Sequence, residues 1–327
     1  MKQGGYTTEE LTTLGPQRTF SGRALAEVAF PLGGIGTGSV SLAGSGALVD
    51  WEIFNRPNIG SRMPYSFITL WARAGGQAPV TKVLQSPPQA PVSGQGRTRF
   101  GGFGFGVNRE NGAGLPHMRA ATFHGEYPFA RIEFEDPAMP VQVALAAYNP
   151  FIPLNAQDSG LPVALFEFKL HNPGDEQVCV SLAANLYNAV GYPGEGPFTG
   201  PTLGGSVNAY LEEGPLRGLR MTSDRYPPDD PRYGSLALAT TWDKVDHQAC
   251  WFRGGWFDPL HHFWDEFSAA GTLAPRAYDE PSPRGQGDVG SIVLRAELAP
   301  GESVALPVIL AWHVPNFVKY WGDAPCD

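Results

Sequence analysis

Residues 163–187 read VALFEFKLHNPGDEQVCVSLAANLY, and this stretch decides the fold class. Every second residue from Ala164 to Leu170 is apolar, which indicates a β-strand with one fully apolar face. The segment Asn172–Asp175 has the composition of a turn. Apolar residues then alternate again from Val178 to Leu186. We therefore predict that the two segments form an antiparallel hairpin.

Within the first of these strands, Phe166 and Phe168 are expected to share the buried face, and Leu165 takes the other face. The same design returns over Ile292–Leu298 and Val304–Trp312, on either side of the turn Ala299–Glu302. Many short strands separated by turns are typical of a β-sandwich. The fold class is therefore all-β, a large, supersandwich-like antiparallel β-sandwich. The other predicted strands are 37–43, 47–55, 65–73, 118–126, 129–135, 140–148, 203–211, 216–223, 234–242 and 247–254.

One short helix is predicted over 258–270. Asp258 can cap the first free N–H groups, and Pro259 suits the first helical position. Phe263 and Phe267 lie four residues apart on one face. Gly271 suits the left-handed position that ends a helix.

Two long Gly/Pro-rich loops are predicted, over 74–116 and 191–202. Loops of the first one's length are usually functional or disordered. Phe103 and Phe105 are expected to be aromatic anchors within it.

The composition excludes several classes of protein. Of the 327 residues, 42% are hydrophobic and only 17% are charged, which excludes an intrinsically disordered chain. A net charge of −9 gives no reason to bind nucleic acid or an anionic membrane. Cys179, Cys250 and Cys326 form no Cys-x-x-Cys pair, so we expect neither a disulfide framework nor a cysteine metal site. With no signal peptide and no long apolar run, we expect no transmembrane segment and a reducing, cytoplasmic location.

The glycine-rich stretch 32–38, LGGIGTG, does not fit a nucleotide site. Ser39 stands where the dinucleotide fingerprint needs glycine, and no Lys-Ser/Thr pair follows. We interpret the stretch as a turn in which one backbone approaches another closely. The seven histidines form no His-Glu-x-x-His motif, and there is no Gly-x-Ser-x-Gly. We therefore expect no cofactor and no metal.

Asp50 and Glu52 would be the candidate catalytic carboxylates if the chain were a glycosidase. On the predicted strand 47–55 they share one face, with Cβ atoms about 7 Å apart. Glycosidases hold their two acids about 5 to 9.5 Å apart. Trp51 and Asn55 would face the other way. We favour the simpler interpretation, that both acids are solvated beside a buried aromatic side chain.

Five stretches together resemble a known family: 30–39 (FPLGGIGTGS), 50–57 (DWEIFNRP), 123–130 (FHGEYPFA), 149–159 (NPFIPLNAQDS) and 310–316 (LAWHVPN). In this order they resemble the N-terminal domain of glycoside hydrolase family 116, the β-glucosidases and non-lysosomal glucosylceramidases. Phe263-Trp264 and Gly271–Leu273 are also similar to that family's short helix. The likeness runs from about residue 20 to the C-terminus.

The resemblance implies a β-sandwich followed by an (α/α)6 helical barrel that carries both catalytic acids. Because this chain stops at Asp327, no catalytic residue is assigned in it. The expected organisation is a tail over 1–19, the sandwich over 20–312 and the start of a linker over 313–327. The expected partner is the C-terminal (α/α)6 catalytic domain. A β-glucoside or glucosylceramide-type substrate would be bound only through that domain.

Three functions remain open. The leading one is a non-catalytic sandwich that shapes the active site of a helical barrel missing from this chain. It predicts an exposed apolar patch. The second is a stand-alone carbohydrate-binding sandwich with Phe103, Phe105 or Trp256 as sugar platforms, and it predicts a groove with aromatic and amide groups. The third is a complete enzyme that uses Asp50 and Glu52.

The residues expected to contact substrate or another domain are Asp50, Trp51, Glu52, Asn55 and Arg56. Trp51 and Asn55 are expected on one strand face. Arg56, next to Pro57, is placed to form a bidentate bond to a carboxylate. That bond could be an internal salt bridge or part of a docking surface, and the sequence leaves both open.

Overall fold

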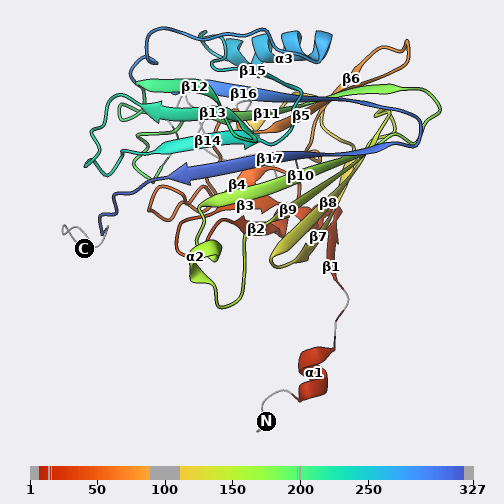
Figure 1. Ribbon diagram of the computed structural model, residues 1–327, viewed down its shortest axis with the longest axis horizontal. Coiled ribbons are helices and arrows are strands. Elements are labelled where there is room, and N and C mark those ends of the chain that lie inside the picture. The colour runs from red at the N-terminus through yellow and green to blue at the C-terminus, as the bar shows by residue number, and fades with distance from the viewer. Residues whose placement is uncertain are drawn as a thin grey trace.

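The computed structural model describes residues 7–13, 15, 17–88, 111–196, 198 and 200–319. Two large antiparallel sheets pack face to face, and a small third sheet lies beside them (Figure 1). The predicted all-β sandwich is confirmed. The strands are β1 Arg18–Ser21, β2 Ala29–Leu32, β3 Val40–Ala43, β4 Leu48–Val49, β5 Ile68–Ala74, β6 Val80–Val83, β7 Ala120–Glu126, β8 Phe129–Glu135, β9 Gln142–Tyr148, β10 Val163–His171, β11 Val178–Tyr187, β12 Ser206–Glu213, β13 Leu216–Ser223, β14 Ser235–Thr240, β15 Val245–Gln248, β16 Val289–Leu298 and β17 Ser303–His313.

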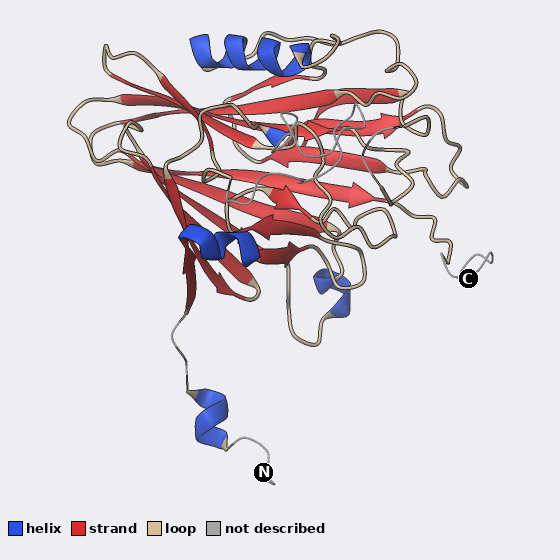
Figure 2. Ribbon diagram, turned by 180° about the vertical axis from the view of Figure 1, so that it is seen from behind, coloured by secondary structure: helices blue, strands red, loops and turns tan. Residues whose placement is uncertain are grey.

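The larger sheet has nine strands in the order β1-β7-β8-β9-β10-β17-β14-β13-β12. The second has five strands in the order β15-β16-β11-β5-β6, and the third is β2-β3-β4. The helices are α1 Thr8–Thr12, the 3-10 turn η1 Gly22–Glu27, α2 Ala156–Ser159 and α3 Asp258–Ala270. In the described part of the chain α3 is thus the one long helix, as predicted (Figure 2).

The predicted hairpin between 163–171 and 178–187 is wrong. β10 pairs with β9 and β17 in the nine-stranded sheet, whereas β11 pairs with β5 and β16 in the five-stranded sheet. The connection between β10 and β11 therefore crosses from one sheet to the other. The connection between β16 and β17 does the same. A period of two fixes which face a residue occupies, but it does not fix the strand's partner.

Asn172 holds the two crossing connections side by side. Its side-chain amide donates to the carbonyls of Glu176 at 2.8 Å, and of Leu298 and Ala299 at 3.1 Å each. The Asn172 side chain is fully buried. Because a buried amide must be paired, these bonds fix both crossings relative to each other.

The core lies between the two large sheets. On β10, Phe166 and Phe168 are buried and Leu165 is half-buried, which agrees with the predicted faces. β11 is buried on both faces along nearly all its length. Helix α3 contacts the same sheet, since the indole of Trp71, on the neighbouring strand β5, donates to the carbonyl of Ser268 at 3.2 Å.

Helix α3 has the predicted bounds, but its N-terminal capping residue is not the predicted one. Phe257 occupies the capping position without a side-chain cap, so Asp258 is an acidic residue in the first turn and not the cap. At the other end Gly271 has φ 68°, the left-handed conformation expected of a helix-ending glycine. Phe263 and Phe267 are both buried, their rings stacked at 5.7 Å.

Several boundaries differ from the prediction. β1 and β2 were not predicted, and β6 lies inside the stretch 74–116 that was expected to be loop. The anchors Phe103 and Phe105 fall outside the described residues. The predicted strand 47–55 shrinks to β4, which ends at Val49. This last difference changes the interpretation of the candidate site.

Candidate functional site

The two candidate carboxylates do not lie on a strand. Asp50 follows the end of β4 and has φ 51°, which turns the chain out of the sheet. Its Oδ1 accepts a hydrogen bond from the backbone N–H of Gly60 at 2.6 Å. Glu52 Oε1 accepts from the backbone N–H of Asn58 at 3.0 Å. Both acids therefore close one loop, 50–61, by bonding its main chain.

Trp51 and Asn55 do not share a face. Trp51 is completely buried in the core, and its backbone N–H donates to Ser61 Oγ at 2.8 Å. Asn55 is half-buried with φ 57°, so the regular alternation of a strand is broken between the two residues.

Asn55 and Arg56 hold the segment that follows the last strand. The Asn55 side chain donates to the carbonyls of Val314 at 3.1 Å and Asn316 at 3.4 Å. Arg56 Nη1 donates to the carbonyl of Val318 at 2.7 Å. This acceptor is a main-chain carbonyl, and the expected bond of Arg56 to a carboxylate stays a prediction. No local pattern indicates these contacts, because the residues that they join lie more than 250 positions apart.

The described residues of the loop 191–202 pack against the loop 50–61. Tyr192 stacks on Phe198 with ring centroids 4.2 Å apart and packs edge-on against Phe54 at 5.2 Å. Its hydroxyl donates to the carbonyl of Gly196 at 2.6 Å and accepts from Asn58 Nδ2 at 3.0 Å. Burial raises the pKa of Tyr192 to about 12, although the bond from Asn58 opposes this shift.

The glycine stretch 33–38 is a turn pressed against another loop, as expected. A Cβ on Gly34 would lie 2.4 Å from the carbonyl oxygen of Leu161. The backbone N–H of Gly33 donates to Asn149 Oδ1 at 2.6 Å, and Ile35 N–H donates to the carbonyl of Ser159 at 2.8 Å. Glycine is required at position 34 because a side chain would collide with the facing backbone.

Four segments thus meet: 33–38, 50–60, 149–161 and 312–318. The indole N–H of Trp312 donates to the carbonyl of Thr37 at 2.6 Å, which joins segment 312–318 to segment 33–38. Gly38 packs against the backbone of Glu52, where an added Cβ would lie 2.7 Å from the carbonyl oxygen. We call the surface formed by these segments the four-loop surface. Four of the five stretches that carry the family resemblance contribute to it.

Exposed apolar side chains gather on the four-loop surface. Of the fifteen large apolar side chains exposed in the described part of the chain, seven lie in its four segments. They are Ile35, Ile59, Phe151, Ile152, Leu154, Leu161 and Phe317. The loop with α2 projects from the body of the sandwich (Figure 1) and carries Leu154 fully exposed. These residues are not among the predicted site residues, although the short apolar run Phe151–Leu154 is a usable signal.

Within the described residues, no group of three or more His, Cys, Asp or Glu side chains is arranged to hold a metal ion. No helix in the described ranges is long and apolar enough to cross a bilayer. Cys179 and Cys250 are free thiols.

The fold defines an antiparallel β-sandwich domain, and the comparisons identify its family. The family model described as "beta-glucosidase 2, glycosyl-hydrolase family 116 N-term" matches residues 29–326. The chain therefore belongs to the family of N-terminal domains of glycoside hydrolase family 116.

Two solved structures were also found to be similar. One is a polysaccharide lyase, with a TM-score of 0.33 and 12% identity over 77% of this chain and 26% of that one. The other is described as a "Putative kojibiose phosphorylase from human microbiome", with a TM-score of 0.36 and 8% identity over 91% of this chain and 32% of that one. The chain thus spans about a quarter to a third of the length of these structures.

Proposed function

We propose that this chain is the non-catalytic N-terminal β-sandwich of a β-glucosidase-type glycoside hydrolase. Its four-loop surface would pack on a C-terminal (α/α)6 catalytic domain and shape the rim of that domain's active site. The observation that carries the proposal is the gathering of seven exposed apolar side chains on one surface. Exposed apolar side chains that gather on one surface are typical of a protein–protein contact.

The construction of the surface supports the same role. Leu154 and Ile59 are 108% and 85% exposed, so an apolar partner could cover almost all of each side chain. Asn55 and Arg56 supply polar groups at its edge and already bind the chain segment 314–318. A mixed surface with an apolar centre and a polar rim is the usual anatomy of an interface.

The activity of the assembled protein follows from this role only as a proposal. Its substrates would be β-glucosides, including glucosylceramide-type lipids, bound through the catalytic domain. Asp50 and Glu52 would act through the shape of the loop 50–61, because both carboxylates bond its main chain. The free thiols of Cys179 and Cys250 are compatible with a reducing, cytoplasmic location.

The test is the association of this chain with a separately produced helical-barrel domain of the same family. We expect a complex in analytical ultracentrifugation, and we expect the chain to raise the barrel's hydrolysis of a chromogenic β-glucoside. The double variant Ile152→Ser/Leu154→Ser should weaken the complex at least tenfold, because two exposed apolar anchors are lost. Its melting temperature should stay unchanged.

The matched control is Leu216→Ser, which removes an exposed leucine from β13, away from the four-loop surface. This variant should bind the barrel normally. Equal weakening by the control, or full binding by the double variant, would exclude the four-loop surface as the docking site.

A further inference from the structure

A second site lies near the N-terminus of α3, apart from the four segments that form the four-loop surface. It is a pocket of about 60 Å³ between the loop that precedes α3 and the loop 285–288. Its described lining consists of Pro64, Tyr65, Tyr187, Phe198, Trp251, Phe252, Arg253, Gly254, Pro259, Gly285, Gln286, Gly287, Asp288 and Val289. A volume of this size holds about four water molecules at roughly 15 Å³ each.

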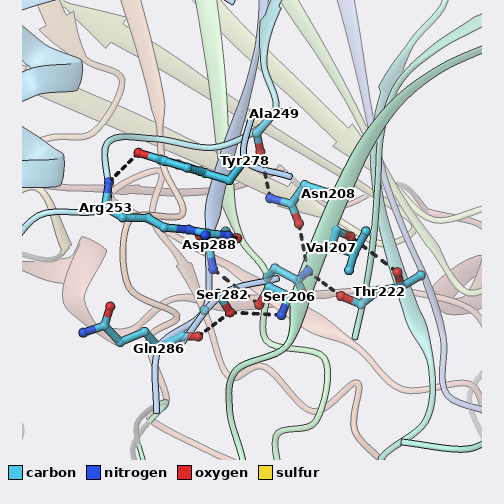
Figure 3. Close-up of polar contacts among 12 residues, drawn as sticks. Ser206, Val207, Asn208, Thr222, Ala249, Arg253, Tyr278, Ser282, Gln286 and Asp288 are labelled. Carbon is cyan, nitrogen blue, oxygen red and sulfur yellow. Dashed lines mark hydrogen bonds and ion pairs between the residues drawn. The ribbon is translucent and has the colours of Figure 1, made fainter. Parts of the chain in front are cut away.

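One wall of the pocket is a bidentate ion pair. Arg253 Nε and Nη2 donate to the two carboxylate oxygens of Asp288 at 2.8 and 2.7 Å (Figure 3). The guanidinium also lies over the ring of Tyr278, 4.1 Å from its centroid. The hydrogen bond to Asp288 raises the pKa of Arg253, so the guanidinium stays charged. Asp288 accepts from two of the five guanidinium N–H donors of Arg253.

Hydrogen bonds to neighbouring residues hold the loop that carries Asp288 in place. Ser282 Oγ donates to the carbonyl of Gln286 at 2.7 Å and accepts from the backbone N–H of Ser206 at 2.9 Å (Figure 3). Gly287 N–H donates to the Tyr187 hydroxyl at 2.8 Å. These bonds fix the position of the wall before a ligand arrives, which lowers the entropy cost of binding.

Aromatic side chains also line the pocket. Trp251 is held by its indole N–H, which donates to Ser291 Oγ at 2.7 Å, and its ring stacks on Phe263. Phe252, another lining residue, is 36% exposed.

The charge of the lining selects among ligands. Arg253 and Asp288 carry the only charges among the described lining residues, and they cancel. Asp288 would repel an anion, and Arg253 would repel a cation. A wholly apolar molecule would leave the polar groups of the wall without hydrogen-bond partners. A neutral molecule with both hydroxyl groups and an apolar C–H face satisfies the donors, the acceptors and the aromatic rings together.

We propose that the Arg253–Asp288 pocket binds one hexopyranose unit of a neutral saccharide, edge-on. The hydroxyls of the sugar edge enter the pocket beside the Arg253–Asp288 wall, and the ring of Phe252 covers part of the C–H face of the sugar. The small volume admits an edge of one ring and excludes a disaccharide lying flat. This binding function goes beyond the docking role proposed above and needs no contact with a catalytic domain.

The test is a titration of the full chain with methyl β-D-glucopyranoside, followed by tryptophan fluorescence and by saturation-transfer NMR. We expect a saturable change with a dissociation constant on the order of 1 mM. Gln286→Ala removes an exposed amide of the lining, and Phe252→Ala removes an aromatic ring. Each should weaken binding by roughly tenfold. The melting temperature of Gln286→Ala should equal that of the parent.

Two controls make the outcome decisive. Phe129→Ala removes a phenylalanine that is 59% exposed on β8, and it should leave binding unchanged. Inorganic phosphate should produce no saturable change, because the ion pair is neutral. The proposal is overturned by an absence of saturation up to about 50 mM glucoside, by equal weakening in Phe129→Ala, by unchanged affinity in both pocket variants, or by phosphate binding that Gln286→Ala abolishes.

Discussion

The side-chain amide of Asn55 donates to the carbonyl of Val314, at 3.1 Å and across 259 positions of sequence. The contact ties an early loop to the segment that follows the last strand. Arg56, the next residue, extends it to Val318. The path of the chain as it leaves the sandwich is therefore set by the two side chains that the sequence marked as interdomain contacts.

Replacing Arg56 by Ala should loosen the segment 314–318 without unfolding the sandwich. The bond from Arg56 to Val318 is half-buried and lies beyond the sheets, so the melting temperature should fall by no more than a few degrees. Hydrogen–deuterium exchange in the peptide that contains Val318 should rise. Unchanged exchange there would mean that Arg56 does not position the segment. A large drop in melting temperature would make it a structural strut of the sandwich.

Phe168→Ala should destabilise the sandwich by about 3–5 kcal/mol, because Phe168 is buried between the sheets. Leu165→Ala on the same strand is the matched control, since Leu165 faces outward and is half-buried. Urea unfolding measures both. A loss below about 1 kcal/mol for Phe168→Ala would contradict the assigned face.

Asn172→Ala should cost about 1–3 kcal/mol of unfolding free energy. The variant leaves the part-buried carbonyl of Glu176 and the buried carbonyl of Leu298 without their donor. Asn172→Asp keeps the size but presents acceptors to those carbonyls, so it should be at least as damaging. If either variant retained the parent's stability in urea unfolding, another group would have to hold the crossings together.

The chain alone should not hydrolyse a chromogenic β-glucoside. Asp50→Asn and Glu52→Gln should instead lower the melting temperature, because each carboxylate accepts from a backbone N–H of the loop 50–61. Turnover that disappears in both variants would restore these residues as catalytic acids.

Alkaline stability should depend on Tyr192. Its pKa is raised by burial to about 12, above the value near 10 of an unfolded tyrosine. A raised pKa means that the stabilisation is complete below about pH 10 and is lost as the pH rises toward 12. Urea unfolding of the parent should lose about 2 kcal/mol from this group over that window. Tyr192→Phe should lose less than the parent.

Tyr210 has to be separated from this effect. Burial, followed by the bond to Glu212, raises its pKa to about 12 as well. The single variant Tyr210→Phe reports its share, and the double variant should show the flattest profile. An equal alkaline loss in the parent and in Tyr192→Phe would exclude Tyr192 as a contributor.

The sequence predicted the faces of the strands better than their partners. Phe168 was assigned correctly because a period of two depends only on local geometry. The pairing of β10 with β17 depends on contacts across 132 positions, such as that between His171 and Ser303, which no local pattern encodes.

The candidate site was misread for a related reason. Asp50 and Asn55 both have positive φ, so the apparent alternation over 47–55 belongs to a loop. Asp and Asn adopt this conformation more readily than other non-glycine residues, but the sequence does not say where they do so. The meeting of the four loops depends on backbone contacts such as that of Gly34 with Leu161, which only the folded chain reveals.

The crossing connections have a consequence for how the protein is made. The neighbours of β10 and β11 in the middle of the two sheets include β17 and β16, the last strands of the domain. A ribosome that has synthesised residues only as far as β15 therefore holds a nascent chain with two long, unpaired strand edges. Such edges can pair with other chains, so shielding by chaperones during translation should matter more for this domain than for a sandwich built from sequential hairpins.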